Sequence, residues 1–557
     1  MKRLIAFSLV ALIPSLTAQD PMIKKIAEEG QQRSQVMDHL NHLTNRIGPR
    51  LTSSDRLTQA ADWAVEQFRS WGLDAKKEQW GTFPVGFNRG PSSGRMLEPK
   101  QMSFTFATRA WSAGTTGRAK GEAIMAPTTV AGVRRLAGKL AGKWVVKESS
   151  GRGGRRGGRR GGRGGGGNSA AREAADLLDE LCKKEGALGT ITSSGQEIVK
   201  TSGNHRVSWD NLPTDVAITI TKSNFEDLQK AMKGSKKVVL EFDIRNWFKK
   251  GPIPLYNVIA DLKGTEKPDE YVVIGGHLDS WDGATGTTDN GTGSSTAMEA
   301  ARILATCGAK PKRTIRFMLW SGEEQGLLGS AAWCKQNQAM LSKISGCFVH
   351  DGGTNYVAGI RGTPTQQAQL KAALGPCTKV SGKLAFTIGE TKRLRGGGSD
   401  HGSYLAHGVP GYFWSQKGRA TYSYGWHTQN DTYDIAIPEY QTHSATVIAL
   451  GAYGIANLDG LLDRTDMRST SEATPLERRL GLDFARGTLK VSGFANERGV
   501  AARAGVEKGD VLLELDGVKL KGDRFILRAT ANNGEPKKKL TLDRGGKKVE
   551  LNINFRK

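Results

Sequence analysis

Residues 271–330 hold most of the side chains in this sequence that could carry out acid–base or metal chemistry. A short apolar run at 271–274 is followed by His277 and Asp279, and Asp289 follows a turn rich in glycine and threonine. Apolar residues then recur at roughly i, i+3 and i+4 spacing, which predicts a helix. An imidazole and two carboxylates before a helix indicate a site for a divalent metal ion.

More acidic residues and a second histidine follow three later apolar runs. The run 314–320 ends at Glu323 and Glu324, another ends at Asp351, and a third precedes a loop that contains His427. In open α/β sheets, ligands bind at the carboxyl ends of the strands. We therefore expect these side chains to meet at one edge of a sheet.

The predicted ligands contribute nitrogen and oxygen atoms and no thiolate, which suits two divalent ions of the zinc type. A carboxylate that bridges two metals is the arrangement of aminopeptidase-type sites. Taken singly, Asp289 could cap the following helix and the adjacent glutamates could form a solvated turn. The ordered recurrence after successive strands favours a metal site. The predicted ligands are His277, Asp289, Glu324, Asp351 and His427.

In the rest of the sequence, apolar β-rich runs alternate with amphipathic helical segments, which predicts an α/β protein. The length of 557 residues predicts several domains. Two such helices precede position 72, and the second starts after Ser53, Ser54 and Asp55. His39 and His42 lie on the first, where a packed or solvated helix face is favoured over a metal pair. We place the main domain at 19–97 and 247–463, an inserted β-rich domain at 98–246, a linker at 464–475 and a small β-rich domain at 476–557.

The first 18 residues predict a secretory signal peptide, with a basic start, an apolar run at 4–13 and small residues ending at Ala18. We therefore expect export to the periplasm or the extracellular space. The apolar run is shorter than the ~20 residues that span a bilayer, and no later stretch is apolar enough to do so. The five cysteines show no CxxC spacing, so we expect packing residues and at most one disulfide.

The chain of 557 residues carries a net charge of +25, and six of the positive charges lie in the glycine- and arginine-rich run at 150–169. Glycine and arginine alone cannot form a packed core, so this run predicts a disordered loop. It lacks interleaved Phe or Tyr for base stacking and follows a signal peptide, which argues against nucleic acid as a partner. Attraction to anionic polymers stays as an alternative, and an insertion without a role is favoured.

Five segments together resemble the co-catalytic zinc exopeptidases, a family that includes bacterial leucine aminopeptidases and glutamate carboxypeptidases. They are HLDSWD, the DNGTG turn, SGEEQGLLGS, the isolated HDGG and HTQNDTYD. Within this family, the segments GGHLDSWDG and PKRTIRFMLWSGEEQG resemble the plasma glutamate carboxypeptidase branch. The resemblance covers roughly 22–462 and implies a mixed, mostly parallel sheet flanked by helices, with two zinc ions as cofactors.

The resemblance also implies a role for each site residue. His277 and Asp351 would bind one metal, Glu324 and His427 the other, and Asp289 would bridge them. Asp279 would orient the His277 imidazole from behind, and Glu323 would be the general base. The oxyanion donor stays unassigned, because Trp426 stands where some relatives carry tyrosine; Tyr422 and Tyr424 are nearby alternatives.

The implied activity is hydrolysis of a peptide bond at a chain terminus. We favour an aminopeptidase or dipeptidase, with a carboxypeptidase as the alternative; a non-catalytic, polyanion-binding scaffold is the rival from another class. The inserted domain resembles a protease-associated domain. The tail resembles a PDZ domain, which binds a peptide chain end at a sheet edge. A packing or dimerisation role for the tail, and with it a homodimer, stays open.

Overall fold

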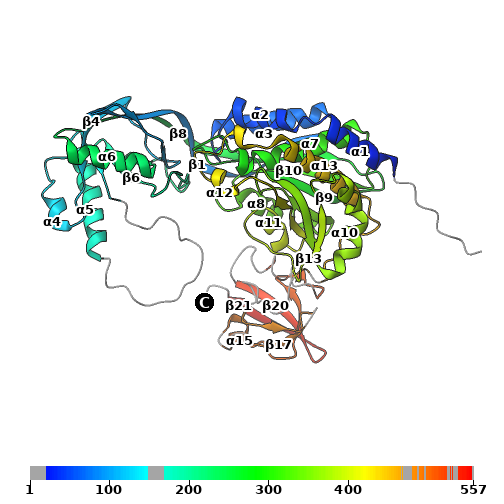
Figure 1. Cartoon of the computed structure of the whole chain (residues 1–557). Coiled ribbons are helices and arrows are strands. Elements are labelled where there is room, and N and C mark those ends of the chain that lie inside the picture. The colour runs from blue at the N-terminus through cyan, green and yellow to red at the C-terminus, as the bar shows by residue number, and fades with distance from the viewer. Residues whose placement is uncertain are drawn as a thin grey trace, which may run out of the picture.

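The computed structural model describes residues 20–148 and 169–465, position 467 and, with short gaps, 480–554. The predicted signal peptide, the arginine-rich run and most of the predicted linker lie outside the described residues. The described part forms a main body, a second lobe and a small C-terminal unit (Figure 1).

The main body is built on a mixed sheet whose core strands are parallel. β11 pairs in parallel with β14 and β9, β9 pairs in parallel with β10, and β8 and β1 continue the sheet as antiparallel strands. This confirms the predicted α/β class with a mostly parallel sheet. The strands are, in spatial order, β14 (Gly411–Phe413), β11 (Ile344–Val349), β9 (Lys267–His277), β10 (Arg313–Trp320), β8 (Val239–Leu262) and β1 (Asp74–Glu98).

These strands are apolar on both faces because helices cover both sides of the sheet. Val272 and Ile274 of β9 face the larger core, whereas Val273 between them faces a second core. β10 repeats the alternation, with Phe317 in the larger core and Met318 in the second. The continuous apolar runs of the sequence therefore reflect burial on both sides.

Helices α1 (Pro21–Gln32), α2 (Val36–Asn41), α3 (Asp55–Ser70), α7 (Thr292–Thr306) and α13 (Pro438–Ala456) pack on one face of the sheet. The other face carries α8 (Leu328–Gln336) and α11 (His401–Ala406). The predicted start of α3 is confirmed, because Ser54 accepts a hydrogen bond from the Leu57 amide as an N-cap. The shorter elements α9 (Gln338–Leu341), α10 (Gln367–Leu374), α12 (Tyr422–Gly425), β12 (Tyr356–Gly362), β13 (Thr387–Glu390) and β15 (Ser415–Lys417) surround this body.

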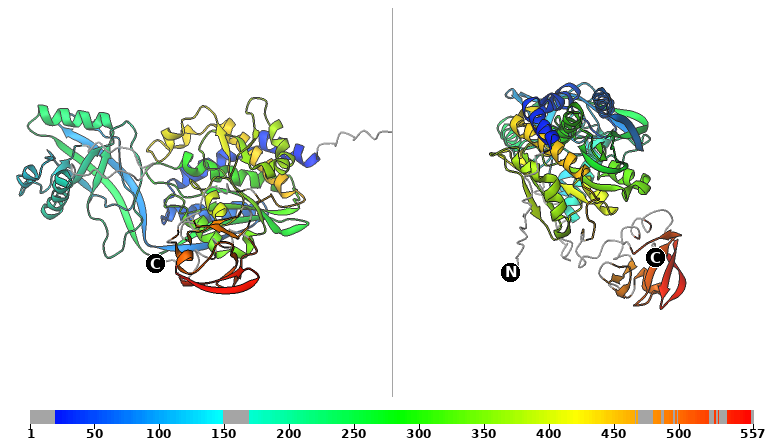
Figure 2. Two further views of the ribbon diagram at one scale, coloured as in Figure 1. Left: turned by 90° about the horizontal axis from the view of Figure 1, so that it is seen from below. Right: turned by 90° about the vertical axis from the view of Figure 1, so that its right-hand side faces the viewer.

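β1 and β8 form a long antiparallel ribbon that runs from the main body into the second lobe (Figures 1 and 2). β1 carries Pro84 and Pro91, which an edge strand tolerates because one row of its amides needs no partner. Register shifts occur beside both prolines, between Phe83 and Val85 and between Arg89 and Ser92. The sequence-based boundary at 246/247 falls inside β8, and the domain boundaries themselves stay predictions.

The second lobe has its own core around Trp144, Ile218 and Phe242. Its strands are β2 (Met102–Ser103), β3 (Phe106–Thr108), β4 (Arg118–Met125), β5 (Trp144–Val146), β6 (Gly189–Ser193) and β7 (Ala217–Ile220). Its helices are α4 (Val130–Arg134), α5 (Ser169–Glu185) and α6 (Lys222–Gly234). Within this part of the chain the sequence predicts β-like runs at 143–148, 187–193 and 216–220, and the structure has β5, β6 and β7 there.

The C-terminal unit has a third core, around Leu489, Leu512 and Leu540. Its described elements are β16 (Asp483–Phe484), β17 (Val491–Gly493), α15 (Val500–Arg503), β18 (Val511–Leu515), β19 (Val518–Lys519), β20 (Lys537–Arg544) and β21 (Lys547–Asn554).

All five cysteines are free thiols, four of them buried, which confirms the prediction of packing residues. Within the described ranges, no helix combines the length and apolar character needed to cross a membrane.

Candidate metal centre

The first group of predicted ligands meets at the carboxyl ends of neighbouring parallel strands. His277 is the last residue of β9, Asp351 comes two residues after β11, and Asp289 lies in the turn Thr287–Gly291 before α7. The Nε2 atom of His277 is 3.2 Å from an Asp289 oxygen and 3.2 Å from an Asp351 oxygen. The side chains of His277, Asp289 and Asp351 are almost completely buried.

The second group lies beside the first. His427 follows α12, and Glu324 follows β10. The Nε2 atom of His427 is 2.9 Å from the second oxygen of Asp289 and 2.9 Å from a Glu324 oxygen. His427 has a φ of 54°, so the loop places its ring through a left-handed backbone turn.

Asp289 belongs to both groups, and within each group the candidate ligand atoms lie within 4.8 Å of one another. A tetrahedral ion with bonds of ~2.0–2.1 Å separates its ligand atoms by roughly 3.3 Å, close to the distances found here. The structure therefore brings all five predicted ligands together as two triads that share one carboxylate. This arrangement fits two metal ions bridged by Asp289.

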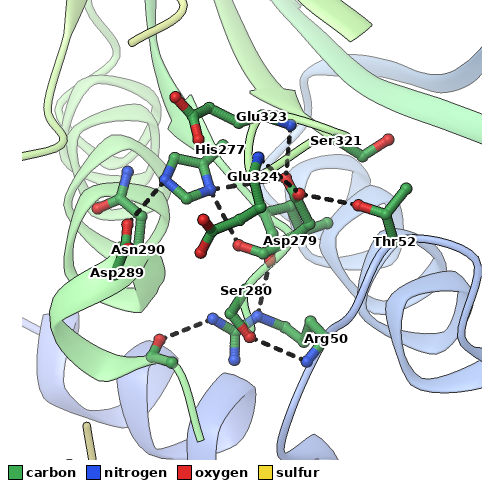
Figure 3. Close-up of polar contacts among 12 residues, drawn as sticks. Arg50, Thr52, His277, Asp279, Ser280, Asp289, Asn290, Ser321, Glu323 and Glu324 are labelled. Atoms are coloured by element: carbon green, nitrogen blue, oxygen red, sulfur yellow. Dashed lines mark hydrogen bonds and ion pairs between the residues drawn. The ribbon is translucent and has the colours of Figure 1, made fainter. Parts of the chain in front are cut away.

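The hydrogen bonding of His277 is also consistent with a metal ion bound at its Nε2 atom. Its Nδ1 atom lies 2.9 Å from the backbone carbonyl of Asp279 and 3.5 Å from that residue's carboxylate (Figure 3). A proton on Nδ1 leaves the Nε2 lone pair pointing at two carboxylates. That contact is repulsive unless Nε2 gains a second proton or a metal ion lies between the groups.

Asp279 was predicted to orient the His277 ring, and its carboxylate also contacts two other segments. Its carboxylate accepts a 2.8 Å hydrogen bond from Thr52 Oγ1 and longer ones from the backbone amides of Glu323 and Glu324. The group thus joins the loop after β9 to the loop after β10 (Figure 3). The nearest acceptor for His277 Nδ1 is the backbone carbonyl of Asp279 and not its carboxylate.

The charges of the two groups shift the pKa values of both histidines upward. Burial alone would lower the pKa of His427, but Glu324 and Asp289 raise it to about 10. Burial likewise opposes the charged form of His277, yet Asp351 and Glu323 raise its pKa well above the usual range. The metal-free site consequently holds protons where a metal-loaded site would hold cations.

The two adjacent glutamates have raised pKa values for one main reason. Burial raises the pKa of Glu323 to about 11, and the carboxylates of Asp351 and Asp400 add to the effect. Burial raises the pKa of Glu324 to about 8, with Asp289 contributing. A nearby divalent cation favours the ionised forms, so both shifts shrink when metal is bound.

Two buried residues that sequence reasoning did not select hold the turn around Asp289. The Asp431 carboxylate accepts hydrogen bonds from the backbone amides of Thr288 and Asp289. The Arg50 guanidinium donates to the carbonyls of Leu278, Leu43, Gly48, Thr285 and Gly286. Asp431 lies only four positions after His427, in a segment already singled out, whereas Arg50 had no local signal.

The second lobe also reaches the site. Thr201 lines a narrow pocket of ≈ 10 Å³ together with Trp281, Asp289, Glu324 and His427. A space of this size admits about one water molecule. Its wall therefore combines residues from both parts of the chain.

The other histidines are packing groups. His39 lies 3.1 Å from buried Glu299, and His42 stacks on Trp63, which confirms the packed helix face. His407 contacts the Ser403 carbonyl, and burial lowers the pKa of both His350 and His401 to about 4.

Asp400 is a buried carboxyl whose pKa burial raises to about 7.

Comparison with known proteins finds a family model that matches the segment carrying this site. Residues 257–451 match the family described as Peptidase family M28. The chain is 26% identical to Carboxypeptidase Q of Mus musculus over 449 residues, covering 80% of this chain and 90% of that protein. Carboxypeptidase Q of Homo sapiens is also 26% identical, over 446 residues, with 80% and 90% covered.

A solved structure is similar over the same extent. The Peptidase M28 precursor from Shewanella amazonensis SB2B superposes with a TM-score of 0.55 at 26% identity, covering 79% of this chain and 97% of that chain. The matched region contains both ligand triads and the strands that carry them. The segment that carries the site is therefore similar to peptidase family M28, and the predicted resemblance to the co-catalytic zinc exopeptidases is confirmed.

Proposed function

We propose that this protein is an exported di-zinc exopeptidase that cleaves the peptide bond next to a chain terminus, as an aminopeptidase or dipeptidase. The observation that carries the proposal is the pair of buried ligand triads sharing Asp289. In this assignment His277 and Asp351 hold one zinc ion, and Glu324 and His427 hold the other. The shared carboxylate of Asp289 bridges the two ions.

Bound zinc would lower the pKa of a water molecule and polarise the scissile carbonyl. Glu323 is the base in our proposal. It follows β10 beside Glu324, and His277 and Asp351 are near enough to act on its pKa. Its carboxylate would accept a proton from water and return it to the leaving nitrogen. Burial keeps bulk water from competing for that proton.

The positioning residues support this assignment through their own contacts. Asp279 fixes the Glu323 and Glu324 amides and faces the back of His277. Asp431 fixes the amides of the turn that carries Asp289. Burial and the carboxylates of the site raise the pKa of Tyr422, so its hydroxyl stays protonated and remains a donor for an oxyanion.

A carboxypeptidase is the second candidate, because the curated relatives carry that name. Leucyl-p-nitroanilide and N-acetylated dipeptides separate the two, since the first needs a free amine recognised and the second a free carboxylate. Both are assayed before and after removal of metal by a chelator, and again after zinc is restored. Zinc-loaded protein that turns over neither of these substrates and no free dipeptide such as Leu-Ala would overturn the peptidase proposal in favour of a non-catalytic scaffold.

Three further assignments rest on the sequence alone. Residues 1–18 direct export, residues 98–246 form a protease-associated domain, and residues 476–557 form a PDZ domain that binds a peptide chain end. For the arginine-rich run, an insertion without a role is favoured, and an accessory contact for anionic polymers is the alternative. Sequencing the N-terminus of protein recovered from an exporting host tests cleavage after Ala18.

A further inference from the structure

A short segment of the second lobe is fastened to the loop that carries His427. The Thr201 amide donates to the His427 carbonyl at 2.8 Å, and the Gln429 side chain accepts from the Val199 amide at 2.8 Å. Lys200 between them forms a β-bridge with Thr428. The second lobe is thus part of the wall beside the predicted metals.

The contact is close-packed on its other side as well. A side chain at Gly283 would meet the Thr201 side chain at 1.9 Å, so only glycine fits there. Residues 199–201 are therefore held on both sides, by the loop 427–429 and by the loop that contains Gly283. A side chain at position 200 is presented from a fixed backbone.

The ammonium group of Lys200 is the unusual feature of this segment. It donates one hydrogen bond, of 2.9 Å, to the Trp426 carbonyl and lies 4.5 Å from the centre of the Trp426 ring. In the described part of the chain, no carboxylate forms an ion pair with it within 4.0 Å. An ammonium has three donors, so two remain for another acceptor.

Metal ions at the site would weaken the attraction between its carboxylates and this cation. Two divalent ions would offset the charges of Asp289, Glu323, Glu324 and Asp351, which lie nearest to them. Asp289 is near enough to act on the pKa of Lys200, which burial lowers. Metal bound to Asp289 would weaken the attraction between Asp289 and the Lys200 ammonium. The ammonium could then pair with an anionic group of the substrate.

We propose that Lys200 binds a carboxylate of the substrate, namely the free α-carboxylate of a dipeptide whose scissile bond lies at the metal centre. The inference rests on the proposed function and names its substrate class. Lys200 directly precedes Thr201, which lines the pocket with Glu324 and His427. In this proposal the carboxylate bound by Lys200 belongs to the residue next to the cleaved bond, which would select dipeptides over longer chains.

The test compares Leu-Ala with Leu-Ala amide, which share the scissile bond and differ in one charge. Wild-type zinc-loaded protein should favour Leu-Ala in kcat/KM by roughly 10–100-fold, the size of a charge-assisted hydrogen bond. Lys200→Met should lose that preference through a higher KM for Leu-Ala while the amide rate stays within about twofold. Lys200→Arg should restore most of it. Lys230→Met, an exposed lysine on α6, is the matched control and should behave as wild type.

Each other outcome has a defined meaning. Leu-Asp amide hydrolysed faster than Leu-Asn amide, with Leu-Ala no better than its amide, would assign the Lys200 site to an acidic side chain instead. Equal loss of both Leu-Ala and Leu-Ala amide turnover in Lys200→Met would show a structural role and overturn the proposal. If wild-type protein hydrolyses neither Leu-Ala nor Leu-Ala amide, the proposed function itself is rejected. The wild-type assay alone gives this result, without the Lys200 variants.

Discussion

At the scale of single residues, the two adjacent glutamates are assigned different tasks. Glu323→Gln keeps the shape of the side chain but removes the base, so kcat should fall by about 10²–10⁴-fold with two zinc ions still bound. Glu324→Ala should instead lose one of the two ions, because it removes a ligand of the second triad. Metal analysis and kinetics on both purified variants check this.

The reverse result is equally readable. Loss of metal in Glu323→Gln together with full metal content in Glu324→Ala would exchange the two roles. Unchanged activity in both variants would contradict the metallopeptidase assignment. It would mean that catalysis needs neither the proposed base, Glu323, nor the proposed ligand, Glu324.

The histidines and buried carboxyls make the metal-free protein sensitive to pH in one direction. The folded pKa values of His427 (about 10), Glu324 (about 8) and Asp431 (about 7) all exceed their ordinary values. Folding therefore binds protons, and stability is full below the unfolded pKa values and is lost as pH rises through the folded ones. The Tm of metal-free protein should fall between pH 6 and 10, which calorimetry measures.

Zinc reverses this dependence, because zinc binding must displace those protons. Titrations of zinc into metal-free protein at pH 7, in buffers of different ionisation enthalpy, should show proton release. No release would mean that the ligands are already deprotonated in the metal-free fold, contrary to the pKa shifts. Asp289 has a lowered pKa through His277 and His427, although burial opposes this, so it adds an opposite effect only in strong acid.

At the scale of elements, Arg50 joins the segment before α3 to the loops after β9. Arg50→Met removes the donor for five backbone carbonyls in a fully buried place, and each acceptor left without a partner is costly. We expect the free energy of unfolding to fall by about 3 kcal/mol or more. Arg56→Met, at an exposed position in the same region, should change it by less than about 0.5 kcal/mol. Urea denaturation compares the two.

The C-terminal unit has a core of its own and so should be dispensable for the chemistry. Ending the chain at Asp466 should leave hydrolysis of leucyl-p-nitroanilide within about twofold of the full-length rate. It should change oligomerisation or the cleavage of longer peptides, which light scattering and peptide digests measure. A truncated protein that stays folded and binds zinc but has lost anilide turnover would show that the unit helps to build the active site.

At the scale of the whole molecule, the net charge of +25 is concentrated partly in one arginine-rich run. Deleting Arg152 to Arg163 removes six cations, and because glycine and arginine alone cannot form a packed core, we expect no loss of core packing. Thermal stability should stay unchanged. Retention on heparin should weaken most at low salt, where electrostatic contacts are least screened. Salt elution identical to that of the intact protein would discard the anionic-polymer role.

The α/β class and the candidate ligand set could both be predicted from the sequence alone, because both depend on short-range patterns. Apolar strands followed by His277, Asp289, Glu324, Asp351 and His427 place the ligands at one sheet edge, since parallel strands end together there. Likewise, Ser54 before an amphipathic run marks the start of α3 as a local cap.

Only the tertiary structure decided what surrounds those ligands. Arg50 meets carbonyls more than 200 residues away, and Lys200 reaches Trp426 across 226 positions. The Lys200 contact depends on how the β1–β8 ribbon carries the second lobe toward the site, whereas Arg50 and its acceptors lie in the main body. Neither set of contacts leaves a periodicity in the sequence. The ribbon itself was hidden because its prolines and register shifts break the strand pattern at an edge where the missing amide costs nothing.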